Sequence, residues 1–242
     1  MAKIHLMLQG KGGVGKSFSF STLAQFYNSK GRNALCIDTD PVNATFAGYA
    51  ALNVQRLEIM NDQKQINPRY FDNLIEIIST TECDIIIDNG SSSFVPLTHY
   101  LISNQVPALI KDMGHELVIH TVVTGGQALL DTVAGFGQLA SQFPQEADFV
   151  VWVNPFWGAV EHDGKSFEQM KAYKDNKARI SSVVYVPTLD PDTFGQDLSQ
   201  TLQDRITFDQ AIANPDLTVM NRQRLKLIRT QLFSQLETAG VI

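Results

Sequence analysis

The feature that most constrains this 242-residue chain is the segment Gly10-Lys11-Gly12-Gly13-Val14-Gly15-Lys16-Ser17. It matches the phosphate-binding pattern G-x-x-x-x-G-K-[ST] without a mismatch. The apolar run at residues 4–8 predicts a strand before the loop, and apolar residues at helical spacing over 18–27 predict a helix after it. Because strand, glycine turn and helix N-terminus are the context that this motif needs, the sequence predicts a loop that binds a nucleoside triphosphate.

The residue types in this loop suit a polyphosphate. The four glycines allow consecutive backbone N–H groups to form a concave nest, and the helix dipole adds positive potential. We expect Lys16 to reach the β- and γ-phosphates and the Ser17 hydroxyl to ligate Mg²⁺. A glycine turn without a ligand is the alternative interpretation.

Size and composition favour one globular α/β domain spanning residues 1–242. The hydrophobic fraction is 44%, the charged fraction is 18% and the formal net charge is −6, which argues against a globally basic nucleic-acid binder. No apolar stretch approaches the roughly 18 residues of a membrane span, and the N-terminus lacks a signal-peptide pattern. We therefore expect a cytoplasmic protein, in which Cys36 and Cys83 are reduced and buried in strands.

Apolar strand runs alternate with helical patterns along the chain. The predicted strands are residues 3–8, 33–38, 84–88, 116–123, 148–154 and 183–186. The predicted helices are residues 15–29, 68–80, 93–103, 126–143, 164–176 and 192–205. This order predicts a doubly wound, mostly parallel sheet with helices on both faces and the active site at the carboxyl ends of the strands.

A second lysine, Lys11, distinguishes this loop from an ordinary one. The pattern K-G-G-V-G-K-S resembles the deviant Walker A box of the ParA/MinD family of ATPases. The resemblance implies an ATP-sandwich homodimer in which Lys11 reaches the nucleotide of the other subunit and neutralises charge there. A solvated loop lysine is the alternative. Phe18 departs from the family, because many relatives have a threonine there, and only its backbone N–H is left to serve the α-phosphate.

The acidic partners of the loop follow two further strands. Asp38-Thr39-Asp40-Pro41 resembles the family's switch I, which implies that Asp40 orients or deprotonates the attacking water and that Asp38 supports the metal's water shell. Alternatively, either carboxylate caps the next helix. The run 83–87 ends at Asp88 in a Walker B pattern, with the carboxylate aimed at Mg²⁺ through water, although a turn is the alternative role. Residues 89–93 follow as switch II, where Gly90 would offer an N–H to the γ-phosphate.

Three residues farther along the chain resemble the family's base pocket. Asn154 ends a strand at the place where the family reads the adenine edge, and an amide can both donate to and accept from the base. Pro187 and Asp190 lie where relatives keep a loop that packs on the purine. A plain turn is the alternative for Asn154.

The C-terminal segment forms an amphipathic helical pattern. Leu225, Ile228, Leu232 and Leu236 share one face, and Arg222, Lys226 and Arg229 share another. We favour a helix docked on the sheet with a solvated basic face. Non-specific DNA binding through that face is the second interpretation, and membrane attachment is the least favoured.

Within the family, residues 38–45, 88–93 and 122–130 resemble conjugal transfer proteins of broad-host-range plasmids. This resemblance implies an auxiliary ATPase, dimeric with Mg·ATP and slow without a partner, that organises or positions the transfer apparatus and interacts with a conjugation or DNA-transfer protein. Two alternatives remain open. One is a metabolic enzyme that activates a small carboxylate, as dethiobiotin synthetase does. The other is a binding module that holds ATP without hydrolysing it.

Overall fold

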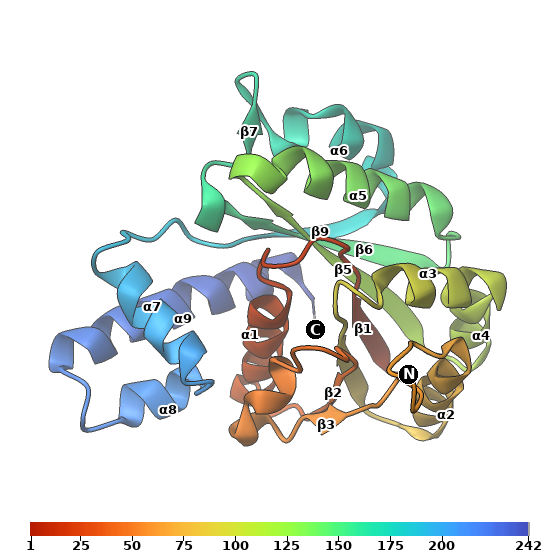
Figure 1. Cartoon of the computed structure of the whole chain (residues 1–242). Helices are drawn as coiled ribbons and strands as arrows, with labels where there is room; N and C mark the ends of the chain where they lie inside the picture. Colours follow the sequence, from red (N-terminus) through yellow and green to blue (C-terminus); the bar gives the residue numbers. More distant parts are fainter. Residues whose placement is uncertain (242) are drawn as a thin grey trace.

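The computed structural model describes residues 1–241 and places seven strands in one sheet (Figure 1). Every neighbouring pair is parallel. The predicted doubly wound parallel sheet is confirmed, and the carboxyl ends of its strands share one edge. In spatial order the strands are β3 (Gln55–Arg56), β2 (Ala34–Asp38), β4 (Asp84–Asp88), β1 (Lys3–Met7), β5 (Glu116–Thr124), β6 (Ala147–Asn154) and β9 (Ile180–Tyr185).

Helices cover both faces of the sheet (Figure 1). The helices on one face are α2 (Phe71–Thr80), α3 (Phe94–Ser103), α4 (Val106–Asp112), α5 (Leu129–Gln142) and α6 (Lys171–Asn176). Those on the other are α1 (Lys16–Ser29), α7 (Phe194–Gln203), α8 (Phe208–Ala213) and α9 (Val219–Ala239). Successive side chains of a strand point to opposite faces, so Leu6 packs under the first group and Met7 under the second. Both faces are buried, which explains why the strands are apolar at nearly every position.

The C-terminal helix α9 docks as predicted. Its apolar stripe is buried against β9, α1, α7 and α8; the stripe consists of Leu225, Ile228, Leu232 and Leu236. Its basic face carries less free charge than the pattern suggested, because Arg229 pairs with Asp209 and Arg222 is half-buried. Across residues 1–241, no helix is both long enough and apolar enough to cross a bilayer.

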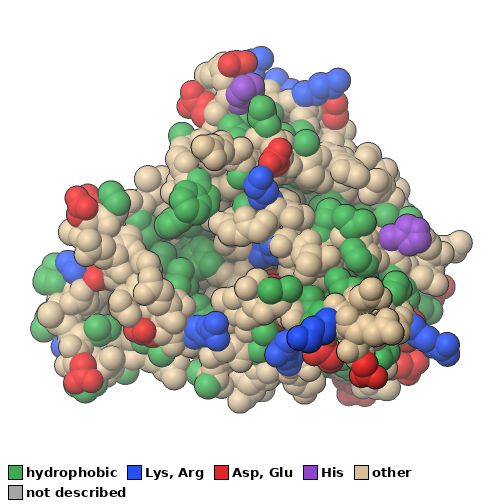
Figure 2. All heavy atoms as spheres, in the orientation of Figure 1, with side chains coloured by type: hydrophobic (Ala, Val, Ile, Leu, Met, Phe, Trp, Pro, Cys, Tyr) green, Lys and Arg blue, Asp and Glu red, His purple; other side chains and the backbone are tan. Residues whose placement is uncertain are grey.

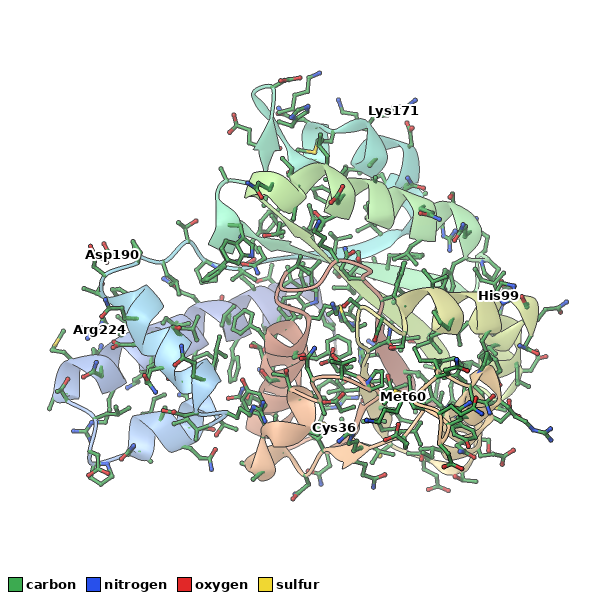
Figure 3. All side chains as sticks on the ribbon, viewed as in Figure 1. Cys36, Met60, His99, Lys171, Asp190 and Arg224 are labelled. Atoms are coloured by element: carbon green, nitrogen blue, oxygen red, sulfur yellow. The ribbon has the colours of Figure 1, made fainter. Side chains whose placement is uncertain are left out.

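Some sequence predictions are wrong in detail. The segment 164–176 is α-helical only from Lys171, because it begins in a hairpin of β7 (Glu161–His162) and β8 (Lys165–Ser166) and continues through the 3₁₀ turn Phe167–Gln169. The turn residues Asp163 and Gly164 have φ of 50° and 71°, which an Asp-Gly pair accommodates. The short elements β3, α4 and α8 lack enough residues for a periodic signal. Cys36 is buried as expected, but Cys83 is exposed because β4 begins only at Asp84. Figure 3 labels Cys36 near α1.

A chain of polar side chains crosses the core on the α1 side of the sheet. The Trp152 indole donates to His120 Nδ1 at 3.0 Å, His120 Nε2 lies 2.9 Å from His5 Nδ1, and His5 Nε2 lies 2.8 Å from the Tyr27 hydroxyl. The Tyr27 hydroxyl lies close to the Asp84 carboxylate. An indole N–H can only donate, so every proton in the chain is assigned: both histidines carry theirs on Nε2, and the donors run toward the Asp84 carboxylate.

Both histidines are fully buried, and burial lowers the pKa of His5 to about 3 and that of His120 well below its usual value. We expect both rings to remain neutral Nε2–H tautomers from pH 8 to pH 5. Imidazole ¹⁵N chemical shifts measure this directly. A charged ring or an Nδ1–H tautomer in that range would contradict the assignment.

The same burial gives the sign of the stability effect. Below about pH 6.5 the unfolded histidines bind protons that the folded ones exclude. Their contribution to stability is therefore complete above that pH and is lost as the pH falls toward 3.

Candidate functional site

The phosphate-binding loop joins β1 to α1, as predicted. Gly13 and Gly15 have φ of 73° and 99°, a region that favours glycine, and Gly15 is the residue immediately before the helix. Within residues 1–241, the backbone N–H groups of residues 12–16 have no protein acceptor. Such a row of free donors at a helix N-terminus is an anion-binding arrangement.

Lys16 lies across the mouth of this loop. Its Nζ donates to the Lys11 carbonyl at 2.9 Å, so the side chain is folded back over the nest. Burial lowers the pKa of Lys16, while the carboxylates of Asp88 and Asp40 nearby raise it. The ammonium therefore faces both the loop and the two predicted acidic partners.

Lys11 lies at the exposed edge of the site, where its side chain pairs with Asp131. Its Nζ lies 2.8 Å from Asp131 Oδ2 at the start of α5, and the two side chains are 46% and 62% exposed. An exposed pair of this kind contributes at most about 1 kcal/mol. The backbone N–H of Lys11 donates to Gln9 Oε1 at 3.1 Å, and Gln9 in turn donates to the Val122 carbonyl. The backbone of Lys11 is thus fixed, while its ammonium is easily released.

Asp88 ends β4 directly beside the helix N-terminus. It is buried, the Ser17 hydroxyl lies beside it, and its Oδ1 has no partner among the described residues. The pKa of Asp88 is raised to about 7, chiefly by burial and also by the carboxylates of Asp38 and Asp40, whereas Ser17 and Lys16 oppose the shift. The Ser17 hydroxyl and the Asp88 carboxylate, whose Oδ1 is unpaired, form a pair of oxygen donors of the kind that suits Mg²⁺. These residues therefore fit the metal that the sequence pattern implied.

Asp38 and Asp40 lie at the end of β2, next to Asp88, and Asp38 is in register with it. Asp38 is fully buried, and its two oxygens accept the backbone N–H groups of Asp40 and Ala47, both at 2.8 Å. Asp40 is half-buried, and its Oδ1 accepts the N–H groups of Val42 and Asn43. Asp38 thus orders the turn that carries Asp40, and Asp40 stabilises that turn through Oδ1, while its Oδ2 lies 3.5 Å from Asn43 Nδ2.

Two glycines allow the surrounding loops to approach one another closely. A Cβ on Gly90 would lie 2.6 Å from the Asp40 carboxylate, and a Cβ on Gly10 would lie 2.9 Å from the Phe94 ring. Asn89, which the sequence analysis did not single out, bonds through Oδ1 to Thr39 and Ser93 and leaves its buried Nδ2 without a partner within residues 1–241. The segment after β4 therefore joins the segment after β2 to the phosphate-binding loop.

A cavity of about 420 Å³ opens beside the loop toward α7. Figure 2 shows it as a hollow with apolar side chains around it. Asn154 and Pro187 of the predicted base pocket line it, together with Phe18 and residues of α7 such as Leu198. Asp190 lies on the segment leading to α7, where its Oδ1 accepts from Thr193 (Figure 3).

Asn154 is held at the cavity wall by two hydrogen bonds within the chain. Its Nδ2 donates to the Val14 carbonyl at 2.9 Å, and its Oδ1 accepts the N–H of Phe156 at 3.2 Å. Both amide atoms are therefore engaged within the chain.

Comparison with known proteins agrees with this geometry. Residues 6–215 match the family described as the CobQ/CobB/MinD/ParA nucleotide binding domain. The chain belongs to this family. Two Escherichia coli proteins named Protein TraL are 65% and 66% identical to it over 242 residues, which cover the whole of each chain. The predicted resemblance to the ParA/MinD family is confirmed.

The solved structures that resemble this chain have the same fold at low identity. MinD complexed with Mg-ADP from Pyrococcus horikoshii OT3 superposes with a TM-score of 0.51 at 17% identity, covering 100% of this chain and 98% of that one. MinD in the MinC:MinD complex of Aquifex aeolicus gives a TM-score of 0.53 at 16% identity, with 96% of each chain covered.

The two aspartates of the β2 turn make a testable pair. Asp38→Asn leaves one oxygen for two buried backbone N–H donors, so we expect urea unfolding without nucleotide to show a loss of about 1–3 kcal/mol. Asp40→Asn keeps the single oxygen that accepts both of its turn bonds, so its cost should stay within about 0.5 kcal/mol. Equal losses in the two variants would contradict the assigned roles.

Proposed function

We propose that this protein is a cytoplasmic switch ATPase that dimerises with Mg·ATP and separates after hydrolysis. The observation that carries the proposal is the row of free backbone donors at residues 12–16, placed beside the Ser17–Asp88 pair and within reach of two lysines. Membership of a nucleotide-binding family supports ATP as the ligand. The phosphates would contact the nest and Lys16, and the base would enter the cavity lined by Phe18 and Pro187.

Ser17 and Asp88 would hold Mg²⁺, and the metal would neutralise negative charge on the phosphates. Asp38 would act indirectly, because both of its oxygens position the turn of Asp40. Asp40 would orient the attacking water and accept its proton, and the packing of its carboxylate on Gly90 fixes its place. Turnover would stay slow until a partner completes this arrangement.

Lys11 would supply the dimer contact. In the single chain its ammonium rests on Asp131 at the surface, a weak pairing that costs little to break. When two subunits face each other, each Lys11 would reach the polyphosphate of the other. Without nucleotide the lysines would repel, so the dimer would depend on ATP.

Full-length similarity to TraL supports a role beside plasmid conjugation. We propose an auxiliary factor that organises or positions the transfer apparatus through a conjugation or DNA-transfer protein, and not the motor that moves DNA. Weak DNA contact would use Lys226 on α9, since Arg229 of the same face pairs within the chain.

Size measurement in Mg·ATP tests the switch. We expect the wild type to become dimeric, Lys11→Ala to remain monomeric, and Asp131→Asn to dimerise up to about fivefold more readily because its Lys11 is free. Asp40→Ala should bind ATP and remain dimeric while losing hydrolysis.

Identical oligomeric states in wild type and Lys11→Ala would refute the sandwich dimer, and full turnover by Asp40→Ala would remove Asp40 from the chemistry. A burst of phosphate release on adding a small carboxylic acid, with no response to DNA or a transfer protein, would favour the metabolic alternative instead. ATP binding with no hydrolysis under any condition would favour the binding module.

A further inference from the structure

The segment that follows β6 is attached to the back of the phosphate-binding loop by two side-chain hydrogen bonds. The Trp157 indole N–H donates to the Gly13 carbonyl at 3.0 Å, and Asn154 Nδ2 donates to the Val14 carbonyl at 2.9 Å. The two acceptors are consecutive carbonyls in the middle of the loop. Neither bond is needed to close a helix or a strand.

These bonds dictate the direction of the amide donors. In a trans peptide the C=O and the next N–H point to opposite sides of the chain, and the structure contains no cis peptide among its described residues. Turning the Gly13 carbonyl toward Trp157 therefore turns the Val14 N–H the other way. In the same manner, the bond from Asn154 turns the Gly15 N–H away from β6. Both N–H groups belong to the row without protein acceptors.

The anchoring segment is itself rigidly seated. Asn154 is buried, and the 3₁₀ turn Pro155–Trp157 begins at its side chain. The same segment packs closely against the loop after β5. A Cβ on Gly125 would lie 2.0 Å from the Gly158 carbonyl oxygen, and a Cβ on Gly126 would lie 2.5 Å from the Trp157 carbonyl oxygen. Only glycine at both positions permits this contact. The Phe156 ring also packs edge-on against the indole, with 4.8 Å between centroids.

We propose that Asn154 and Trp157 form a carbonyl clamp, a pair of positioning residues that preorganise the amide nest for the phosphates of the nucleotide. This rests on the proposed function of the loop and goes beyond it, because it gives Asn154 a role at the phosphate site, through the backbone, in addition to the predicted contact with the purine edge. It also gives a role to Trp157. This residue is 58% exposed, so water could satisfy its indole N–H, yet the N–H is bonded to the loop. The clamp orients the amides that bind the phosphate groups, so it affects every polyphosphate ligand, whatever its base.

Calorimetry with two probes tests the clamp. Trp157→Phe keeps the aromatic ring and removes the N–H, so we expect the Kd values for Mg·ATP and for inorganic Mg·tripolyphosphate to rise together, by about fivefold each. Leu198→Ala is the matched comparison, because Leu198 lines the base cavity and does not contact the loop carbonyls. It should weaken ATP binding and leave tripolyphosphate binding unchanged. Thermal melts without ligand should be the same for wild type and Trp157→Phe.

Asn154→Asp gives a second, independent readout. The substitution retains the oxygen that accepts from Phe156 and replaces the donor to Val14 by an acceptor, so both probes should bind at least as weakly as to Trp157→Phe. If Trp157→Phe and Asn154→Asp weaken ATP alone, or neither ligand, the clamp is refuted while the proposed function stands. If the wild type binds neither ATP nor tripolyphosphate, the proposed function fails and the clamp fails with it.

Discussion

The backbone amides that open α1 impose the constraint around which this site is built. They must be left without acceptors in the protein and still be held in one orientation, although an unpaired N–H is costly to bury. The chain meets both demands by bonding to the carbonyl side of the loop. Lys16 holds the Lys11 carbonyl, Trp157 holds that of Gly13 and Asn154 holds that of Val14. The backbone N–H groups are thereby exposed on a loop of fixed conformation, where they can bind an anion.

Parallel strand pairing brings the acidic side chains next to the phosphate-binding loop. β2 and β4 pair in register from residue 34 to residue 38, so Asp38 and Asp88 end side by side at the carboxyl edge of the sheet. Burial raises the pKa of both carboxyls, and a neighbouring cation offsets that effect: Arg56 for Asp38 and Lys16 for Asp88. Bound Mg²⁺ would be a stronger cation than either. Close contacts at Gly10 and Gly90 then bring the loops after β1, β2 and β4 together around this charge.

Much of this arrangement can be predicted from the sequence. The features that cannot be predicted depend on contacts between residues far apart in the chain. The loop motif, the alternating strands and helices, and the aspartates at strand ends depend on local spacing, so the fold and the acidic residues were predicted. Asp131, Gln9 and Trp157 act through contacts 120, 113 and 144 residues apart in the chain, and no local pattern reports such pairings. Asn154 was found by resemblance, but its bonds to Val14 and Phe156 depend on rotamer and packing. The segment 164–176 was misread because a two-residue turn resets the periodicity.

Backbone amide shifts in a ¹H–¹⁵N spectrum, recorded while Mg·ATP is added, test the central claim most directly. Hydrogen bonding of phosphate oxygens to the nest predicts large downfield proton shifts for Gly13, Val14, Gly15 and Lys16, well above those of residues elsewhere in the sheet. A titration in which these four amides do not move, or move no more than distant surface amides, would contradict the account.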